Sequence, residues 1–255
     1  MRLIAEGDSE AYRGALEKFL RRLLLRSRLS KPEQEAILAL PGQEVRTAAH
    51  RDIVRPGHRS TFSTLVVDGL VARFDQLANG HRQITALHIA GDFCDLHSLA
   101  VPETGWGMES LTDSVVRQVP HEALRKLVTG SPAIAIAFWR DTVVDSSLLA
   151  KWASALGRRS AKSRLAHLLC EMGTRVEHAG LGTADNFDFP ITQSQIADVL
   201  GITPVHLNRT MQALRQEQLL TTSGSRFSLP DRQRLCQIAL FDPAYLLLTK
   251  QPNGD

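Results

Sequence analysis

The sequence is poor in cysteine and in aromatic residues. The 255 residues include three cysteines, and aromatic residues make up 5% of the chain. Cys94, Cys170 and Cys236 are odd in number, far apart in the sequence and form no Cys-x-x-Cys pair. This pattern argues against a disulfide framework and against a cysteine-ligated zinc or iron–sulfur site. It favours a reducing, cytoplasmic environment, and for Cys170, which lies among leucines, a packing role.

Long apolar runs are also missing. The chain reaches Glu6 and Asp8 without one, and no stretch approaches the roughly 18 residues of a membrane span. We therefore expect no signal peptide and no membrane partner. Hydrophobic residues still make up 43% of the chain, enough to bury the core of one large domain or two modest ones.

The net charge is small but unevenly distributed. The formal charge is +3, yet basic residues outnumber Glu171 and Glu177 between 151 and 178. Such an excess attracts polyanions, although a solvated helical face explains it equally well. The basic residues are Lys151, Arg158, Arg159, Lys162, Arg164 and Arg175.

The hydrophobic pattern of the first half changes period. Leucines and arginines at helical spacing over 11–28 predict a helix, and a beta pattern begins at Thr61. Asp68-Gly69 and Asn79-Gly80 are typical of two-residue hairpin turns, and a further turn is expected at Gly91-Asp92. With another beta stretch at 112–120, the pattern predicts a small antiparallel barrel or sandwich.

A long helix is predicted after Pro132. Its apolar residues recur at spacings of three, four or seven, as expected for packing against a second chain or against the barrel of its own chain. Phe138 and Trp139 are expected in the core or at a dimer seam. A further helix at 163–172 and a loop at 182–190 follow. The apolar residues of the long helix are Ala137, Val144, Leu148, Trp152 and Ala155.

Two short helices are predicted around a glycine in "ITQSQIADVLGITPVHLNRTMQALR". Thr192 and Gln195 match a capping box, and Gly201 suits a left-handed turn at the end of the first helix. Thr203 can cap the second helix, with Pro204 at its first position. Two short helices that cross closely over a tight turn are typical of a helix-turn-helix.

The second helix carries polar residues that do not belong to its apolar face. In a helix-turn-helix, the N-terminal residues of the second helix meet base edges in the major groove. Arg209 can donate two bonds to guanine, His206 or Asn208 can reach a base or a phosphate, and Val205 can touch a thymine methyl group. Downstream, "LLTTSGSRFSLPD" predicts a wing that places Arg226 near phosphate.

These motifs resemble the Crp/Fnr superfamily of bacterial transcription regulators. "ITQSQIADVLGITPVHLNRTMQALRQEQLL" is similar to its DNA-binding signature, and "VVDGLVARF…GHRQITALHIAGDF" is similar, more loosely, to its sensory beta-roll. The resemblance implies an α+β fold: a beta-roll at 20–127, a dimerisation helix at 132–157 and a winged helix-turn-helix domain at 158–232. It implies a non-catalytic homodimer that reads palindromic double-stranded DNA, with RNA polymerase as a further candidate partner.

The family resemblance also assigns site residues. Arg209 falls on the family's base-reading arginine, while Val205 replaces a common acidic reader, so the target sequence should differ. The predicted DNA-binding residues are Thr192, Gln193, Thr203, Val205, His206, Asn208, Arg209 and Arg226.

The predicted effector pocket departs from the cyclic-nucleotide-binding members. Those members carry a Gly-Glu-Leu run followed by an Arg-Ser or Arg-Thr pair. Here Leu96 or a neighbour replaces the glutamate, and no arginine lies between Arg82 and Arg117. A buried phosphate would be left uncompensated, so we expect an effector other than cyclic AMP. The candidate pocket residues are Gly91, Asp92, Phe93, Leu96 and His97.

Several alternatives stay open for the signal and the function. They are an unknown small molecule, a redox role for a lone cysteine, no effector at all with a purely structural Gly-Asp turn, and a metal or haem in the barrel. We predict no cofactor. A barrel enzyme and a protein-binding module are the alternatives to DNA binding. The metal reading would use His81, His88 and His97 near Cys94, Asp92 and Asp95, which have no recognised ligand spacing.

Overall fold

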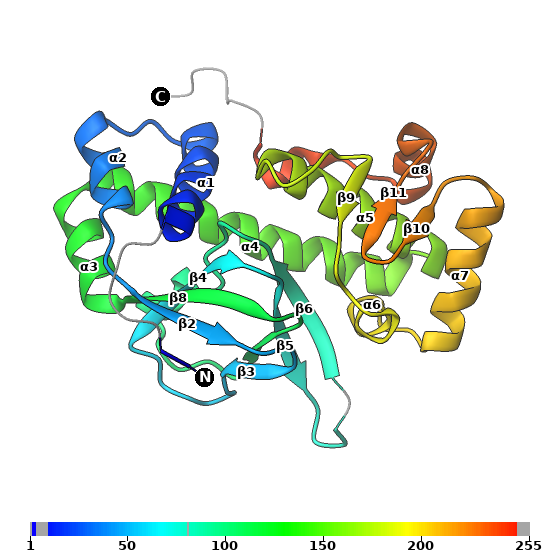
Figure 1. Ribbon diagram of the computed structural model, residues 1–255, viewed down its shortest axis with the longest axis horizontal. Coiled ribbons are helices and arrows are strands. Elements are labelled where there is room, and N and C mark those ends of the chain that lie inside the picture. Colours follow the sequence, from blue (N-terminus) through cyan, green and yellow to red (C-terminus); the bar gives the residue numbers. More distant parts are fainter. Residues whose placement is uncertain (1, 4–9, 81, 249–255) are drawn as a thin grey trace.

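The structure is a computed structural model that describes residues 2–3, 10–80 and 82–248. The expectations about a signal peptide and about His81 concern residues outside these ranges. Figure 1 shows a β-rich N-terminal part and a mostly helical C-terminal part, with a long helix, α4, running beside both. The observed order of elements confirms the predicted α+β fold of beta-roll, long helix and winged helix-turn-helix domain.

The N-terminal part is a roll of two antiparallel sheets with helices at its ends. One sheet has the order β1-β2-β8-β4 and the other β3-β7-β5-β6. Helix α1 confirms the helix predicted at 11–28, and β8 confirms the beta stretch predicted at 112–120. The elements are β1 (Arg2–Leu3), α1 (Glu10–Arg26), α2 (Lys31–Leu38), β2 (Gln43–Thr47), β3 (Arg51–Val54), β4 (Phe62–Asp68), β5 (Val71–Gln76), β6 (Arg82–His88), η1 (Leu96–Leu99), β7 (Gly107–Ser110), β8 (Ser114–Pro120) and α3 (His121–Gly130).

The two predicted hairpin turns fare differently. The turn at Asp68-Gly69 is not a hairpin, because β4 pairs with β8 while β5 pairs with β6 and β7. Gly69 has a φ of +91° and carries the chain from one sheet to the other. Asn79-Gly80 does lie between β5 and β6, which form a hairpin, but β5 ends at Gln76 and β6 begins at Arg82, so the connection is longer than two residues. The Asp68-Gly69 dipeptide therefore predicted that the chain turns, but not which strand pairs with β4.

Helix α4 (Pro132–Arg158) packs its predicted apolar seam against its own chain. Phe138 contacts Phe19 of α1, with ring centroids 5.6 Å apart. Further along, Val144 and Trp152 are buried beside β6. Trp139, next to Phe138, is 67% exposed. The seam therefore belongs to the intrachain core, and the opposite face of α4 is left open.

The C-terminal part forms a helical domain with a small three-stranded sheet of order β10-β11-β9. The stretch predicted as a loop at 182–190 contains β9, whose Phe187 is buried opposite Phe227 of β11. Its three-residue length is too short for a periodic signal. The elements are α5 (Ala161–His178), β9 (Asn186–Asp188), α6 (Gln193–Leu200), α7 (Pro204–Gln216), β10 (Thr221–Ser223), β11 (Arg226–Ser228), α8 (Arg232–Ala239) and η2 (Pro243–Leu246).

Candidate nucleic-acid interface

Helix α6 begins and ends as the sequence predicts. The Thr192 side chain accepts a hydrogen bond from Gln195 N at 3.2 Å, and the Gln195 side chain accepts one from Thr192 N at 2.8 Å. This capping box satisfies two N–H groups that have no partner within the helix. Gly201 ends the helix with a φ of +60°, a conformation that costs glycine little. The tight turn to α7 follows from these local signals.

Helix α7 is fixed by its cap and by one buried face. Thr203 Oγ1 accepts from His206 N at 3.2 Å, and Pro204 occupies the first turn. Leu207, Met211 and Leu214 are buried in the core of the domain. With one side held in this way, the opposite side of α7 is presented outward as a rigid surface.

The outward face of α7 carries the predicted base readers. Val205 is 64% exposed, His206 and Arg209 are exposed, and Asn208 is half-buried. No described carboxylate lies within ion-pair distance of Arg209, so its charge is not offset within the structure. An exposed, uncompensated guanidinium on the first turns of such a helix can contact guanine or phosphate.

A groove runs between α7 and the start of α5. It brings together four predicted residues, Thr203, Val205, His206 and Arg209. The other wall comes from residues 160–162 at the start of α5. Ser160 caps α5 by accepting from Ser163 N at 3.2 Å. The N–H groups at the start of α5 therefore face the same groove, where a helix N-terminus favours a phosphate.

The remaining predicted DNA-binding residues lie outside this groove. Thr192 and Gln193 are exposed at the start of α6. Arg226 lies on the wing, where its guanidinium pairs with Asp188 at 2.9 Å and donates to Asn186 Oδ1 at 2.7 Å. Both partners lie on β9, which the sequence prediction did not include. The charge of Arg226 is thus offset locally, in contrast to that of Arg209.

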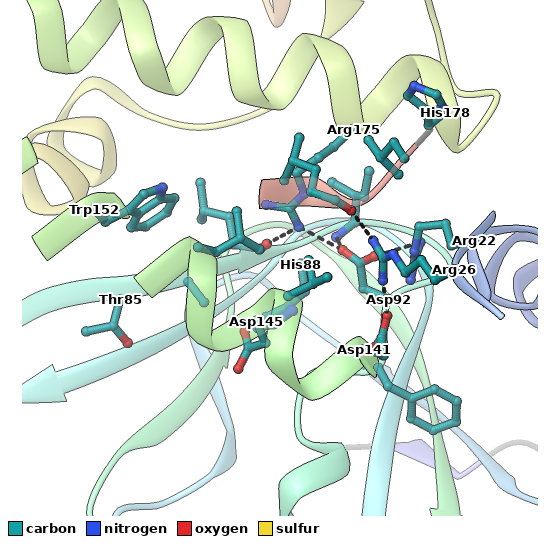
Figure 2. Close-up of a pocket in the computed structure, with 18 residues that line it drawn as sticks. Arg22, Arg26, Thr85, His88, Asp92, Asp141, Asp145, Trp152, Arg175 and His178 are labelled. Atoms are coloured by element: carbon teal, nitrogen blue, oxygen red, sulfur yellow. Dashed lines mark hydrogen bonds and ion pairs between the residues drawn. The ribbon is translucent and has the colours of Figure 1, made fainter. Parts of the chain in front are cut away.

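The predicted effector residues are not gathered into one pocket. Asp92 and Phe93 line a pocket between the beta-roll, α1, α4 and α5, shown in Figure 2. Leu96 is buried in the core formed with α1. His97 lies on another side of the roll, with its ring 5.3 Å from that of Trp106. Gly91 uses its φ of +92° for the turn after β6.

Asp92 joins three parts of the molecule. It pairs with Arg22 of α1 at 2.8 Å and with Arg175 of α5 at 3.0 Å, and it accepts from Ile89 N at 2.8 Å (Figure 2). Burial raises the pKa of Asp92, but the two guanidinium groups outweigh it and hold the pKa below its usual range. Arg175 also donates to Leu87 O at 2.6 Å. The Gly-Asp turn therefore connects the beta-roll to the helix that begins the C-terminal domain.

A second contact ties the beta-roll directly to the helix-turn-helix. Gln83 on β6 donates to Asp198 O at 2.6 Å and to Val199 O at 3.1 Å, both on α6. Apolar residues of the roll, including Ile84 and Leu87, share one buried cluster with the C-terminal domain. The helix-turn-helix is thus held against the roll. A shift of β6 would move its contacts with α6, and a shift of the Gly91-Asp92 turn would move its contacts with α5.

The segment after α8, which contains η2, packs over α1, α4 and α5 near the junction of the roll with the C-terminal domain. Glu171 of α5 is fully buried and accepts from Trp152 Nε1 at 3.0 Å and from Tyr245 OH at 2.8 Å. Arg26 of α1 donates to Leu246 O at 2.8 Å. Burial raises the pKa of Glu171. The segment after α8 therefore acts as a strap over α1, α4 and α5, a role that no local sequence signal predicted.

Arg73 is a buried cation that the sequence reasoning overlooked. It lies on β5, outside the 82–117 window searched for a phosphate-binding arginine, and it reaches the region of His97 and Trp106. Its guanidinium is held in two bonds by Asp145 of α4, at 2.7 and 3.2 Å. The charge is thus neutralised by the chain itself. Among the described residues, no three His, Cys, Asp or Glu side chains are arranged to hold a metal.

Comparison with known proteins places this architecture. A family model described as "Crp-like helix-turn-helix domain" matches residues 163–238. A "Probable transcriptional activator" from Rhizobium leguminosarum bv. viciae is 27% identical over 185 residues, covering 72% of this chain and 76% of that protein. The solved structure of FixK2 from Bradyrhizobium japonicum is 28% identical with a TM-score of 0.71, covering 78% of this chain and 98% of that one.

The Crp-like helix-turn-helix match and these similar proteins support the Crp/Fnr superfamily of bacterial transcription regulators for this chain. A CooA mutant from Carboxydothermus hydrogenoformans shares the fold at 18% identity, with a TM-score of 0.63 over 85% of this chain and 94% of that one. The matched helix-turn-helix range contains every predicted DNA-binding residue, from Thr192 to Arg226. It also includes most of α8, which packs on α5 beyond the predicted domain end at 232. No described helix is long and apolar enough to cross a membrane.

Proposed function

We propose that this Crp/Fnr protein is a homodimeric regulator that reads a palindromic DNA site with α7 and catalyses no reaction. The observation that carries this proposal is the exposed polar face of α7, where Arg209, paired with no described carboxylate, lies at the groove beside the start of α5. In a helix-turn-helix, this position meets base edges. Val205 and His206 extend the same face, so we assign them to base contact, and Asn208, at its half-buried edge, to base or phosphate contact.

Phosphate contacts surround this reading face in the proposal. Thr203 and the start of α5 at 160–162 line the groove, and Thr192 and Gln193 are exposed at the start of α6. Arg226 would exchange its exposed ion pair with Asp188 for a phosphate. Such a pair is worth little in water, so the exchange costs little. Where DNA binding activates transcription, we expect RNA polymerase as the next partner.

The open face of α4 supports the dimer. Three of its exposed apolar residues recur at spacings of three and four, as in a coiled-coil seam, while the opposite face of α4 packs on its own chain. Trp139 contributes most, at 67% exposure. Two copies joined here would present their α7 helices as a two-fold pair, about 34 Å apart, as successive major grooves require. The residues of this face are Ile136, Trp139 and Val143.

We expect Trp139→Glu to prevent dimerisation and, with it, binding to a palindrome. The substitution places a charge at the centre of an apolar seam, where it cannot be hydrated. Sedimentation equilibrium would report the mass of the wild type and the variant. Leu77→Glu is the matched control, because Leu77 is 58% exposed on the β5–β6 loop, away from α4. A Trp139→Glu protein that stays dimeric would place the interface elsewhere.

The signal for this regulator is, in our proposal, something other than cyclic AMP. Arg73 is the buried cation nearest to His97 and Trp106, and Asp145 already neutralises it. A phosphate would have to displace that carboxylate or lie beside it, and either arrangement is costly. A signal that loosens the Asp92 and Gln83 contacts would instead release α5 and α6 from the roll and shift the spacing of the α7 helices.

The test is a selection of binding sites from random DNA by the full-length protein, with and without cyclic AMP. We expect one palindrome to be enriched equally in both, with an affinity that falls steeply with salt because phosphates are contacted. Enrichment only with cyclic AMP would refute the proposed signal while keeping the DNA-binding function. If no DNA sequence is enriched in either arm, and if any remaining binding of the protein to DNA does not weaken with salt, a protein-binding module would be favoured.

A further inference from the structure

Two of the three cysteines meet inside the DNA-binding domain. Cys170 on α5 and Cys236 on α8 are far apart in the sequence, but their sulfur atoms lie 3.4 Å apart. A disulfide has a sulfur–sulfur distance near 2.05 Å, so closure needs an approach of about 1.4 Å. The helices α5 and α8 pack directly against each other. The packing role predicted for Cys170 is confirmed, but it does not describe the whole site.

The two thiols differ in environment in the way that a reacting pair requires. Cys170 is fully buried, whereas Cys236 is only partly buried, at the edge of the same core. Behind them, Arg232 is held by a 2.8 Å hydrogen bond from its Nη2 to Thr174 Oγ1. This arrangement places one partly buried sulfur in front of one enclosed sulfur, with a cation beside them.

The same arrangement activates the outer cysteine. The hydrogen-bonding contact with Cys170, together with the charge of Arg232, lowers the pKa of Cys236 to about 6. The interaction with Cys236, together with burial, raises the pKa of Cys170. Cys236 is therefore the more acidic of the two thiols and the one more readily converted to a thiolate. The thiolate is the reactive form of cysteine, and accessible thiolates of low pKa next to a second cysteine are oxidised selectively.

We propose that Cys236 and Cys170 form a redox-active dithiol that a peroxide oxidises to a disulfide. The Cys236 thiolate attacks one peroxide oxygen, the O–O bond breaks, and the leaving hydroxide takes up a proton as Cys236 becomes a sulfenic acid. The Cys170 sulfur then attacks the Cys236 sulfur, the S–O bond breaks, and water leaves as the S–S bond forms. The two thiols lose two electrons and two protons, and hydrogen peroxide is reduced to two waters.

The disulfide would enclose the DNA-reading elements in one loop. Residues 171–235, which include α6, α7 and the wing, lie between the two cysteines. A cross-link over a loop of this length restricts the unfolded chain and stabilises the folded domain. In a reducing compartment such a disulfide is transient, so it would form when peroxide is present and be reduced again afterwards. The oxidation itself does not depend on DNA recognition, and it can be tested without DNA.

The experiment treats the reduced full-length protein with an equivalent of hydrogen peroxide. We expect the intact mass to fall by about 2 Da as two thiols close to a disulfide. Peptide mapping without reductant should then show the 170–236 linkage, and the melting temperature should rise. Cys94→Ser is the matched control, because Cys94 is buried in the roll and burial raises its pKa. This variant should behave as the wild type does.

Two variants separate the steps. Cys170→Ser should stop at the sulfenic acid of Cys236, which dimedone traps, and Cys236→Ser should resist the same dose of peroxide. A wild-type protein that keeps both thiols, or that accumulates sulfinic acid on Cys236 without a link to Cys170, would overturn the proposal. So would a disulfide between two chains. The wild type and Cys94→Ser decide these outcomes even where the other variants fail to fold.

Discussion

Arginines in two regions of this protein differ in burial and in ion pairing. On the recognition helix α7, Arg209 is exposed and has no described carboxylate partner. At the junction of the roll with the C-terminal domain, Arg22 and Arg175 are nearly buried and share Asp92. An uncompensated cation in water is free to exchange its hydration for a phosphate or a base. A cation out of water must be paired, because leaving it alone costs far more than the pair gains.

The difference separates residues for partners from residues for architecture. The charge of Arg209 matters only when DNA is present, whereas the charge of Arg175 matters whenever the chain is folded. Sequence counts of basic residues between 151 and 178 mix the two kinds, because the structure buries Arg175 at the junction and pairs Lys162 with Glu217 at 2.5 Å. Substitutions in the two regions should therefore change different quantities.

The largest effect is expected from Asp92→Ala. It removes the carboxylate shared by Arg22 and Arg175, which leaves Arg22 without its ion-pair partner and Arg175 with only the 3.5 Å pair to Glu171. Breaking a buried pair in this way typically costs about 3–5 kcal/mol of unfolding free energy. Urea unfolding of the full-length protein measures the loss. Asp188→Ala is the control, because its pair with Arg226 is exposed and should contribute less than about 1 kcal/mol. Equal losses would erase the contrast between the two regions.

The pH dependence of the unfolding free energy tests how much the buried junction disfavours a positive charge on His88. His88 is buried among the same groups, and burial lowers its pKa to about 4. As the pH falls below about 6.5, the unfolded chain binds a proton that the folded His88 does not, so folding becomes less favourable. Relative to His88→Gln, the wild type should lose up to about 3 kcal/mol of unfolding free energy by pH 4.

The comparison with His88→Gln is needed because another group acts in the opposite direction. Burial raises the pKa of Asp95 to about 7. The folded protein therefore holds a proton on Asp95 that the unfolded chain has lost, which favours folding at low pH. Asp95 is present in both proteins, so its contribution cancels in the difference. A stability difference that stays constant from pH 7 to pH 4 would show that His88 is hydrated in solution.

Arg209→Ala should weaken DNA binding by about 1–3 kcal/mol and relax one base preference. Binding by the full-length protein to its selected palindrome, and to palindromes with single base changes, measures both. The unfolding free energy should stay within about 0.5 kcal/mol of the wild type, since Arg209 is exposed. Arg13→Ala on α1 is the matched control for loss of one exposed arginine. Unchanged affinity and base preference would mean that α7 enters the groove in another register.

The smallest effect is expected at the wing. Arg226→Ala removes a cation that is already paired with Asp188, so DNA affinity should fall less than with Arg209→Ala and equally for all sequences. The dependence of log affinity on log salt should become shallower by no more than about one unit. Measurements of affinity across a salt series, with the wild type in parallel, decide this. A loss that depends on base sequence would instead assign Arg226 to a base edge.

The local devices of the helix-turn-helix could be predicted because each depends on near neighbours. The Thr192–Gln195 capping box, the left-handed Gly201 and the Thr203 cap all act within four residues. The partner of a strand depends on distant residues, which is why Asp68-Gly69 suggested a hairpin that β4 and β5 do not form. Strand β9 was missed for the same reason, since its three residues are held by β11.

The effector residues show the same division. Gly91, Asp92 and Phe93 are consecutive, and the resemblance to the family's sensory beta-roll suggested one pocket with Leu96 and His97. In the structure, Asp92 is used by Arg22 and Arg175, and Phe93 packs on Phe19 with ring centroids 4.9 Å apart. The alternative of a structural corner at the Gly-Asp turn agrees with these contacts.

By itself, the sequence determined the class of the chain, the helix-turn-helix with its caps and turn, and the residues that α7 presents outward. These depend on hydrogen bonds and side-chain spacing within one or two helical turns. Only the tertiary structure decided which cations are neutralised, which face of α4 is left open, and that Cys170 and Cys236 meet. These features depend on residues far apart in the sequence, such as Asp92 and Arg175, 83 positions apart, and Cys170 and Cys236, 66 positions apart. Burial, which sets the cost of a charge, exists only once the whole chain is packed.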